Sequence, residues 1–246
     1  MKKIKFIIFV IFVLITNFTF EQAYSRPQKG GVVELVHKSN KCIIRKKIQN
    51  NGEIFIIKIF KNKMNYKVNT NNGGDVDFYL NSNFFGPTSP IGEVIVNGKV
   101  VNNKVKRGGY FTSNGGGPTI SLYNRPNSLY STQTKYITIK NGTLNESMFI
   151  SRLSKWKTYR TLLGEDKNGN LILIHSGING LLSVEDITLI GKSESMINSL
   201  MFDGGSSIEV LLKDGTFKHK YHSVSDIEKK IFKIHKPFVY ITGVFK

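Results

Sequence analysis

The stretch Ser199–Leu212, SLMFDGGSSIEVLL, contains the pattern that decides the fold. Its two apolar runs, 199–203 and 207–212, are rich in residues that favour strands, and a glycine-rich segment separates them. Glycines at the end of a strand permit positive φ angles and allow backbone to approach a ligand closely. The stretch therefore predicts two strands joined by a loop that can hold a ligand.

The same rhythm of short strand-forming runs extends along most of the chain. Asn-Gly or Asp-Gly pairs at 97–98, 141–142 and 214–215 lie between neighbouring runs, a pattern that is typical of β-hairpins. The other predicted strands span residues 53–60, 66–70, 76–80, 93–97, 99–105, 108–112, 118–123, 136–140, 170–175 and 237–245.

Only two segments favour helices. In the segment 182–195, Ser183 stands three residues before Asp186, which resembles a capping box ahead of an apolar face. The segment 223–232 offers Ser and Asp caps but has a weaker apolar face, so a loop is the alternative there. We therefore predict an α+β fold, one compact domain with a β-rich mixed-sheet core and a few helices.

Composition and charge exclude several classes of protein. The 246-residue chain is 40% hydrophobic, enough to build a core, which rules out a disordered or fibrous protein. The single cysteine, Cys42, excludes an intrachain disulfide framework and predicts no cysteine-based zinc or iron–sulfur site. The net charge of +18 favours polyanionic partners, whether nucleic acid, lipid head groups, wall polymers or phosphorylated sugars.

The first 25 residues predict export. Lysines within 1–5 precede the apolar run 6–20, and Ala23-Tyr24-Ser25 supplies small residues of the kind a signal peptidase reads. The apolar run is shorter than the roughly 20 residues of a spanning helix, which favours cleavage over an uncleaved membrane anchor. We expect 1–25 to be a signal peptide, with the protein secreted or in the cell envelope (periplasm or extracellular). No stable membrane span after cleavage and no nucleic-acid partner are then expected.

Three further segments combine polar side chains with glycine or with strand ends. The last of them leads into the predicted strand that ends at His175. Backbone N–H groups of such loops often hold phosphates and sugars. In chain order these segments are 81–86, 107–118 and 159–170.

Taken in order, these segments resemble the motifs of the phosphodiester glycosidase family. Residues 81–85 resemble the family's Asn-Gly-Gly-Phe-Phe-like stretch, 92–100 its Gly-x-Val hairpin, 160–169 its Arg-Thr element, and 201–206 its Asp-Gly-Gly segment. The resemblance covers about residues 75–246. We therefore expect a phosphodiester glycosidase-like domain over 75–246, preceded by an N-terminal strand region over 26–74.

The resemblance implies hydrolysis of a sugar-1-phosphodiester, with N-acetylglucosamine as the model sugar and a phosphomonoester as the leaving group. Arg160 is expected to bind the phosphate, and Asp203 to act as general base or electrostatic stabiliser. His175 is expected to donate to the phosphate or to carry a proton. The residues expected to bind substrate are Asn81, Asn83, Gly108, Gly109, Gly204, Gly205, Ser206 and Ser207.

Some residues depart from the family pattern, and other functions remain open. Ser82 and Asn83 replace two glycines, and His175 begins a His-Ser-Gly stretch where many relatives have Asp-Gly. This second departure favours a non-catalytic binding module for anionic envelope or extracellular polysaccharide. A nucleic-acid or phospholipid binder driven by net charge is the third alternative. No redox or nucleotide cofactor is expected, the His positions near the C-terminus show no metal-ligand spacing, and a role for a divalent cation stays open.

Each candidate residue also has a structural interpretation. Asp203 can cap backbone amides of its turn, and His175 can bond to backbone at the end of a strand. Arg160 can be one solvated charge among 35 basic residues.

Overall fold

The computed structural model describes residues 31–72, 74–82, 84–85, 89–103, 107–122, 127–223 and 239–246. Strands dominate this part of the chain, and α3 (Val184–Ser193) is its one α-helix longer than a single turn. The fold is therefore mostly β, with less helix than an α+β class implies. The predicted signal peptide and the residue Asn83 lie outside the described residues.

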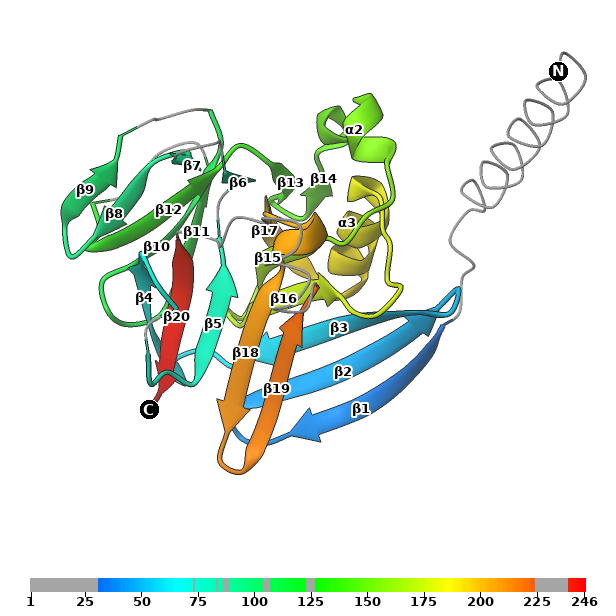
Figure 1. Cartoon of the computed structure of the whole chain (residues 1–246), viewed down its shortest axis with the longest axis horizontal. Coiled ribbons are helices and arrows are strands. Elements are labelled where there is room, and N and C mark those ends of the chain that lie inside the picture. The colour runs from blue at the N-terminus through cyan, green and yellow to red at the C-terminus, as the bar shows by residue number, and fades with distance from the viewer. Residues whose placement is uncertain are drawn as a thin grey trace, which may run out of the picture.

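The largest sheet contains eight strands, and each neighbouring pair is antiparallel. Its spatial order is β1 (Val32–Lys38), β2 (Cys42–Gln49), β3 (Gly52–Ile59), β16 (Leu171–Ser176), β15 (Thr161–Asp166), β17 (Met196–Phe202), β13 (Ile137–Lys140) and β14 (Thr143–Leu144). Its blue strands β1, β2 and β3 cross the lower part of Figure 1, and the sheet continues from β3 into the strands beside α3.

A second sheet, the β18 sheet, lies in front of the first in Figure 1. It combines the C-terminal strand with strands from three other parts of the chain. Its order is β19 (Phe217–His222), β18 (Glu209–Asp214), β5 (Phe78–Asn81), β20 (Tyr240–Phe245) and β4 (Met64–Asn69).

The third sheet, the β10 sheet, forms the green lobe of the molecule (Figure 1). A two-stranded ribbon of β6 (Phe84–Phe85) and β7 (Pro90–Ile91) is separate from it. The order of the β10 sheet is β11 (Thr119–Leu122), β10 (Gly109–Ser113), β12 (Tyr130–Thr134), β8 (Val94–Val96) and β9 (Lys99–Asn102).

Every pair among the described strands is antiparallel, so the expectation of a mixed sheet is wrong. Short hairpins join some of these pairs, such as β1–β2 and β18–β19, whereas others, such as β16–β3 and β20–β4, join strands that are far apart in the chain. No helix among the described residues is long and apolar enough to cross a membrane.

The two larger apolar clusters of the core lie on opposite faces of the eight-stranded sheet, and a small third cluster is formed by Val76, Tyr79, Leu211 and Tyr240. Side chains alternate along β16: Leu171 and Leu173 join the cluster shared with the β18 and β10 sheets, whereas Ile172 and Ile174 join the cluster under α3. The strand is thus buried on both faces, which explains its continuous apolar run.

Local sequence signals set the ends of several elements as predicted. Ser183 Oγ accepts from Asp186 N, and Asp186 Oδ2 accepts from Ser183 N, each at 3.0 Å, which completes the capping box of α3. Asn97 and Asn141 have φ angles of 51° and 48°, and the glycine after each also has a positive φ, as a two-residue hairpin turn requires.

The sequence did not predict strands β12, β15 and β19 or the two-residue strands β6, β7 and β14, and it placed β1 and β2 only within a general N-terminal strand region. Of these, β12, β15 and β19 carry many polar or charged residues, and β12 (YSTQT) is buried along its whole length although its side chains are mostly polar. The predicted strand 99–105 ends at Asn102, before residues outside the described part. The candidate helix 223–232 lies outside it as well, except for Ser223.

Candidate functional site

The antiparallel pairing of β15 and β17 brings together Arg160 and Asp203, two of the predicted catalytic residues. Thr161 pairs with Phe202, which places Arg160 and Asp203 next to one another at the ends of these strands. The pairing continues into the loop, where Gly205 N donates to Tyr159 O at 2.8 Å. A side chain at Gly204 has no room, because its Cβ would lie 2.4 Å from Tyr159 O. The Arg160 and Asp-Gly-Gly motifs therefore form one structural unit.

Asp203 occupies a half-buried position at the start of this loop. Its Oδ1 accepts from Gly204 N at 2.9 Å, and its carboxyl group also bonds to the Ser207 hydroxyl. Burial raises the pKa of Asp203 from 3.8 to about 6, although both hydrogen bonds act in the opposite direction. A carboxyl group with such a pKa can accept or donate a proton near neutral pH.

The Arg160 side chain is oriented by main-chain carbonyls. Its Nε donates to Leu182 O at 3.2 Å and its Nη2 to Trp156 O at 2.8 Å. Its backbone N donates to Ser176 Oγ at 2.9 Å. Burial lowers the pKa of the guanidinium, but Arg remains charged at any physiological pH. A cation is thus held in a fixed direction beside the glycine loop.

The remaining loop residues complete a small polar surface. Gly205 has a φ of 63° and begins the 3₁₀ turn Gly205–Ser207. This turn carries the hydroxyls of Ser206 and Ser207 within four residues of Asp203 in the sequence. Backbone amides and hydroxyls in such a turn suit phosphate or sugar oxygens.

Asn81 is the last residue of β5. Its Oδ1 accepts from Glu209 N at 2.8 Å, and its side chain is fully buried. Within the described part of the chain, Asn81 Nδ2 has no hydrogen-bond acceptor. A buried donor without an acceptor costs free energy, so an incoming oxygen atom would be stabilised there.

Strand β12 contacts both the end of β5, near Asn81, and the end of β17, near Asp203. Ser82 Oγ lies 3.2 Å from Thr132 Oγ1, and Thr134 Oγ1 donates to Met201 O at 2.8 Å. The polar residues of this buried strand therefore hold the ends of β5 and β17 in place.

Gly108 and Gly109 are close-packing positions. A Cβ at Gly108 would lie 2.0 Å from Thr134 O, and one at Gly109 would lie 2.4 Å from Leu200 Cδ2. These glycines let β10 approach β12 and β17 beneath the site, and their predicted role in binding substrate stays a prediction.

His175 is not grouped with Arg160 and Asp203. It is fully buried between the sheets, 5.2 Å from Phe55 in a stacked arrangement. Its Nδ1 donates to Ser176 O at 2.9 Å, so its Nε2 accepts from His219 Nε2 at 3.0 Å. Burial lowers the pKa of His175 to about 3 and that of His219 to about 4. Both ring nitrogens of His175 are thus engaged inside the protein.

Glu209 is a buried acidic residue that the sequence analysis did not single out. Tyr240 Oη donates to Glu209 Oε2 at 2.9 Å, and His222 Nδ1 lies 3.6 Å from Oε1. The one available signal was an acidic residue within the apolar run 207–212. Glu209 supports the site through its backbone N, which holds Asn81, while its carboxylate bonds to Tyr240.

Two open pockets of about 280 and 350 Å³ share Asn114, Asn127 and Ser128 and lie at the end of the β10 sheet that is distant from Gly109. They have no carboxylate or basic group in their lining, so hydrolytic chemistry is better supported by the Asp203 loop.

A half-buried arginine lies next to Asp203 in the strand pairing, and the Asp203 carboxyl has a raised pKa. With the amides and hydroxyls of the glycine loop, these groups fit a site for a phosphorylated or carbohydrate ligand. The chain belongs to the phosphodiester glycosidase family, whose model matches residues 64–234. No curated protein matches the chain.

Solved structures show the same fold at low sequence identity. The catalytic domain of zebrafish N-acetylglucosamine-1-phosphodiester α-N-acetylglucosaminidase, auto-inhibited by its pro-peptide, is 15% identical, with a TM-score of 0.58 over 90% of this chain and 86% of that one. A hypothetical protein from Synechocystis is 11% identical, with a TM-score of 0.62 over 89% of this chain and 64% of that one. A putative exported protein from Burkholderia pseudomallei is 7% identical, with a TM-score of 0.50 over 81% and 74%.

Replacing Asp203 with Asn is expected to stabilise the protein. At neutral pH the fold holds an ionised carboxylate where burial disfavours its charge. Asp203→Asn removes that cost and should raise the free energy of unfolding by about 1–3 kcal/mol above about pH 6. The gain should vanish below about pH 4, where the carboxyl is protonated in both states. Urea unfolding at the two pH values measures it.

Asp75→Asn is the control, because Asp75 is fully exposed and should change stability by less than about 0.5 kcal/mol. If Asp203→Asn is no more stable than the wild type at neutral pH, the fold does not raise the pKa of Asp203.

The buried histidine pair predicts loss of stability in mild acid. Both folded pKa values lie below 6.5, so the unfolded state binds more protons and stability falls as the pH falls below about 6.5. Gln at position 219 can still donate to His175 Nε2 but does not titrate. Between about pH 5 and 6.5, the free energy of unfolding should fall as the pH falls in both proteins. The slope for His219→Gln should be smaller than that of the wild type by about 1 kcal/mol per pH unit. If urea unfolding gives the same pH slope for the wild type and for His219→Gln, the two histidines are not held in their neutral form by the fold.

Proposed function

We propose that the protein is a secreted glycosidase that hydrolyses a sugar-1-phosphodiester, N-acetylglucosamine-like in its sugar, to free sugar and a phosphomonoester. The observation that carries the proposal is the pairing of β15 with β17, which places Arg160 beside the Asp203-Gly204-Gly205 loop. Family membership and the name of the zebrafish relative support the choice of substrate class.

The reaction breaks the bond between sugar C1 and the phosphate oxygen. Water adds its hydroxyl to C1, its proton is taken up, and the phosphate leaves as a monoester. A phosphate monoester departs readily, so the site must mainly neutralise its charge, stabilise the positive charge that develops at C1 and activate the water.

The chain supplies groups for each of these tasks. Arg160 binds two phosphate oxygens through its guanidinium, and the Gly204–Ser207 turn adds amide and hydroxyl donors. Ionised Asp203 either removes the proton from water or stabilises the charge at C1. Asn81 Nδ2 donates to an oxygen of the sugar or the phosphate.

A non-catalytic module for anionic polysaccharide is the second candidate, and one observation favours it. His175 begins the stretch that stands in place of the Asp-Gly of many relatives, and its imidazole is buried and bonded within the protein. If the Asp of those relatives is catalytic, this chain lacks it. Ligand binding without turnover would identify this second function.

Site variants should separate these two functions. With N-acetylglucosamine-1-phosphate esters, including a nucleotide-sugar surrogate, the wild type should release reducing sugar. Asp203→Asn and Arg160→Lys should each lose about 10²-fold or more in kcat/KM. The matched controls are Asp75→Asn and Arg152→Ala, which alter exposed side chains and should keep wild-type rates. Folding is checked by circular dichroism.

Folded wild type that binds the esters but releases no sugar would support the binding module. Release that survives both site variants would place the reaction elsewhere in the molecule.

The pH dependence of the reaction tests the role of Asp203. A general base with a pKa of about 6 predicts that kcat/KM falls about tenfold per pH unit below about pH 6. The bond from Ser207 lowers the pKa of Asp203, so Ser207→Ala should move this limb to higher pH. Ser206→Ala is the comparison, and its limb should stay in place. If Ser207→Ala leaves the acid limb of kcat/KM at the same pH, the titrating group is not Asp203.

A further inference from the structure

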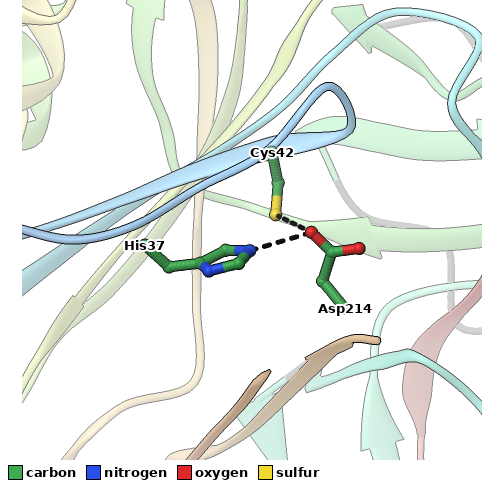
Figure 2. Close-up of side chains that lie close together, drawn as sticks. All are labelled: His37, Cys42 and Asp214. Atoms are coloured by element: carbon green, nitrogen blue, oxygen red, sulfur yellow. Dashed lines mark hydrogen bonds and ion pairs between the residues drawn. The ribbon is translucent and has the colours of Figure 1, made fainter. Parts of the chain in front are cut away.

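Two hairpins from distant parts of the sequence meet at a cluster of three potential metal ligands. The β1–β2 hairpin contributes His37 and Cys42, and Asp214 comes from the end of β18 at its turn into β19. Figure 2 shows the three side chains pointing toward one another. His37 Nε2 lies 2.8 Å from Asp214 Oδ2, and Cys42 Sγ lies 3.6 Å from the same oxygen. All three donor atoms lie within 4.8 Å of one another.

The donor set suits Zn²⁺. An imidazole nitrogen, a thiolate sulfur and a carboxylate oxygen are its common protein ligands, whereas Mg²⁺ and Ca²⁺ prefer oxygen alone. Ligand atoms around a tetrahedral zinc ion lie about 3.3–3.7 Å apart, as follows from metal–ligand distances of about 2.0–2.3 Å. The spacings within the cluster therefore need only small side-chain shifts.

The backbone around the cluster aims these side chains. The register of β1 against β2 shifts between Leu35 and His37, and such a bulge redirects the side chains that follow it. In the turn, Ser39 Oγ accepts from Lys41 N at 3.0 Å and from Cys42 N at 3.2 Å. The ring of Phe217 stacks on His37 with centroids 4.1 Å apart, which fixes the plane of the imidazole.

The solvent exposure of the cluster leaves room for a water ligand. Cys42 is fully buried, whereas the side chains of Asp214 and His37 are 9% and 19% exposed. Three protein ligands with one open side provide an access path and a fourth position.

A cysteine nucleophile fits this arrangement poorly. In a nucleophilic site the imidazole bonds to the thiol, but here the carboxylate lies between His37 and Cys42 (Figure 2). Burial raises the pKa of the Cys42 thiol to about 12, which keeps it protonated in the metal-free protein.

Lys41 is a nearby charge that opposes a cation at the cluster. Its Nζ lies 4.0 Å from Asp214 Oδ1, and its side chain is one-third exposed. A lysine with that exposure can turn into solvent when a metal ion neutralises Asp214.

We propose that His37, Cys42 and Asp214 bind one Zn²⁺ ion, with water as the fourth ligand, and that this ion clamps the N-terminal hairpin to the β18–β19 hairpin. Two ligands precede the residues matched by the family model and one lies within them. The site also shares no residue with the groups to which we assign the hydrolysis. The sequence analysis considered only sites built from several cysteines and so did not consider this mixed set.

Cobalt spectroscopy tests the site directly. Tag-free, full-length protein, stripped with a chelator, should bind one Co²⁺ with a thiolate-to-metal charge-transfer band that Zn²⁺ abolishes. Zinc at a hundredfold excess over its Kd should raise the melting temperature by about 5–10 °C. Cys42→Ser should lack the charge-transfer band, and Asp214→Asn should weaken cobalt binding at least about tenfold.

Asp75→Asn is the matched control, since this exposed carboxylate pairs with Lys213 in the same sheet and should leave both readouts unchanged. Lys41→Met should keep or tighten binding, because it removes the opposing charge. Absence of the charge-transfer band in the folded wild type would overturn the proposal without reference to any variant. A band or a zinc-induced shift that persists in Cys42→Ser and Asp214→Asn would overturn it too.

Discussion

The pairing of β15 with β17 is the constraint on which the site depends. These strands lie at the centre of the eight-stranded sheet, each with neighbours on both sides. Their register places Thr161 opposite Phe202 and so sets Arg160 against the loop that begins at Asp203. The chain then leaves this sheet through Gly204 and Gly205 and enters the β18 sheet. A shift of one residue would turn every buried side chain to the wrong face, so the core fixes the geometry of the loop.

The same loop combines close packing with an electrostatic cost. A side chain at Gly204 would collide with Tyr159 O, and the neighbouring Asp203 is itself half-buried. Desolvation raises the pKa of Asp203, while the Gly204 amide and the Ser207 hydroxyl limit the rise. The outcome is a carboxyl group that titrates near neutral pH, which is a typical property of catalytic and binding sites.

Buried polar groups connect the layers around this loop. Thr132 and Thr134 of β12 contact the ends of β5 and β17, and His175 reaches from the eight-stranded sheet to His219 in the β18 sheet. Each bond joins two sheets, so the polar groups specify how the layers stack, in addition to the apolar contacts. The His175–His219 pair is therefore one of the polar contacts that hold these two sheets together.

The sequence by itself determined the elements whose signals are local. The Asn-Gly turns, the Ser183–Asp186 capping box and the continuous apolar run of β16 act within a few residues, and the structure confirms them. Local motifs also indicated the family, and through that resemblance they assigned Arg160 and the Asp-Gly-Gly loop to one site.

Only the tertiary structure decided what depends on distant partners. Strands β12 and β19 are polar, and they form because neighbouring strands complete their hydrogen bonds. His175 and His219 are 44 residues apart, and His37 and Asp214 are 177 apart, so no spacing rule relates them. Their burial, their pKa values and their partners arise when sheets pack on one another, because a side chain's environment is set by the neighbours that the fold supplies and not by those along the chain.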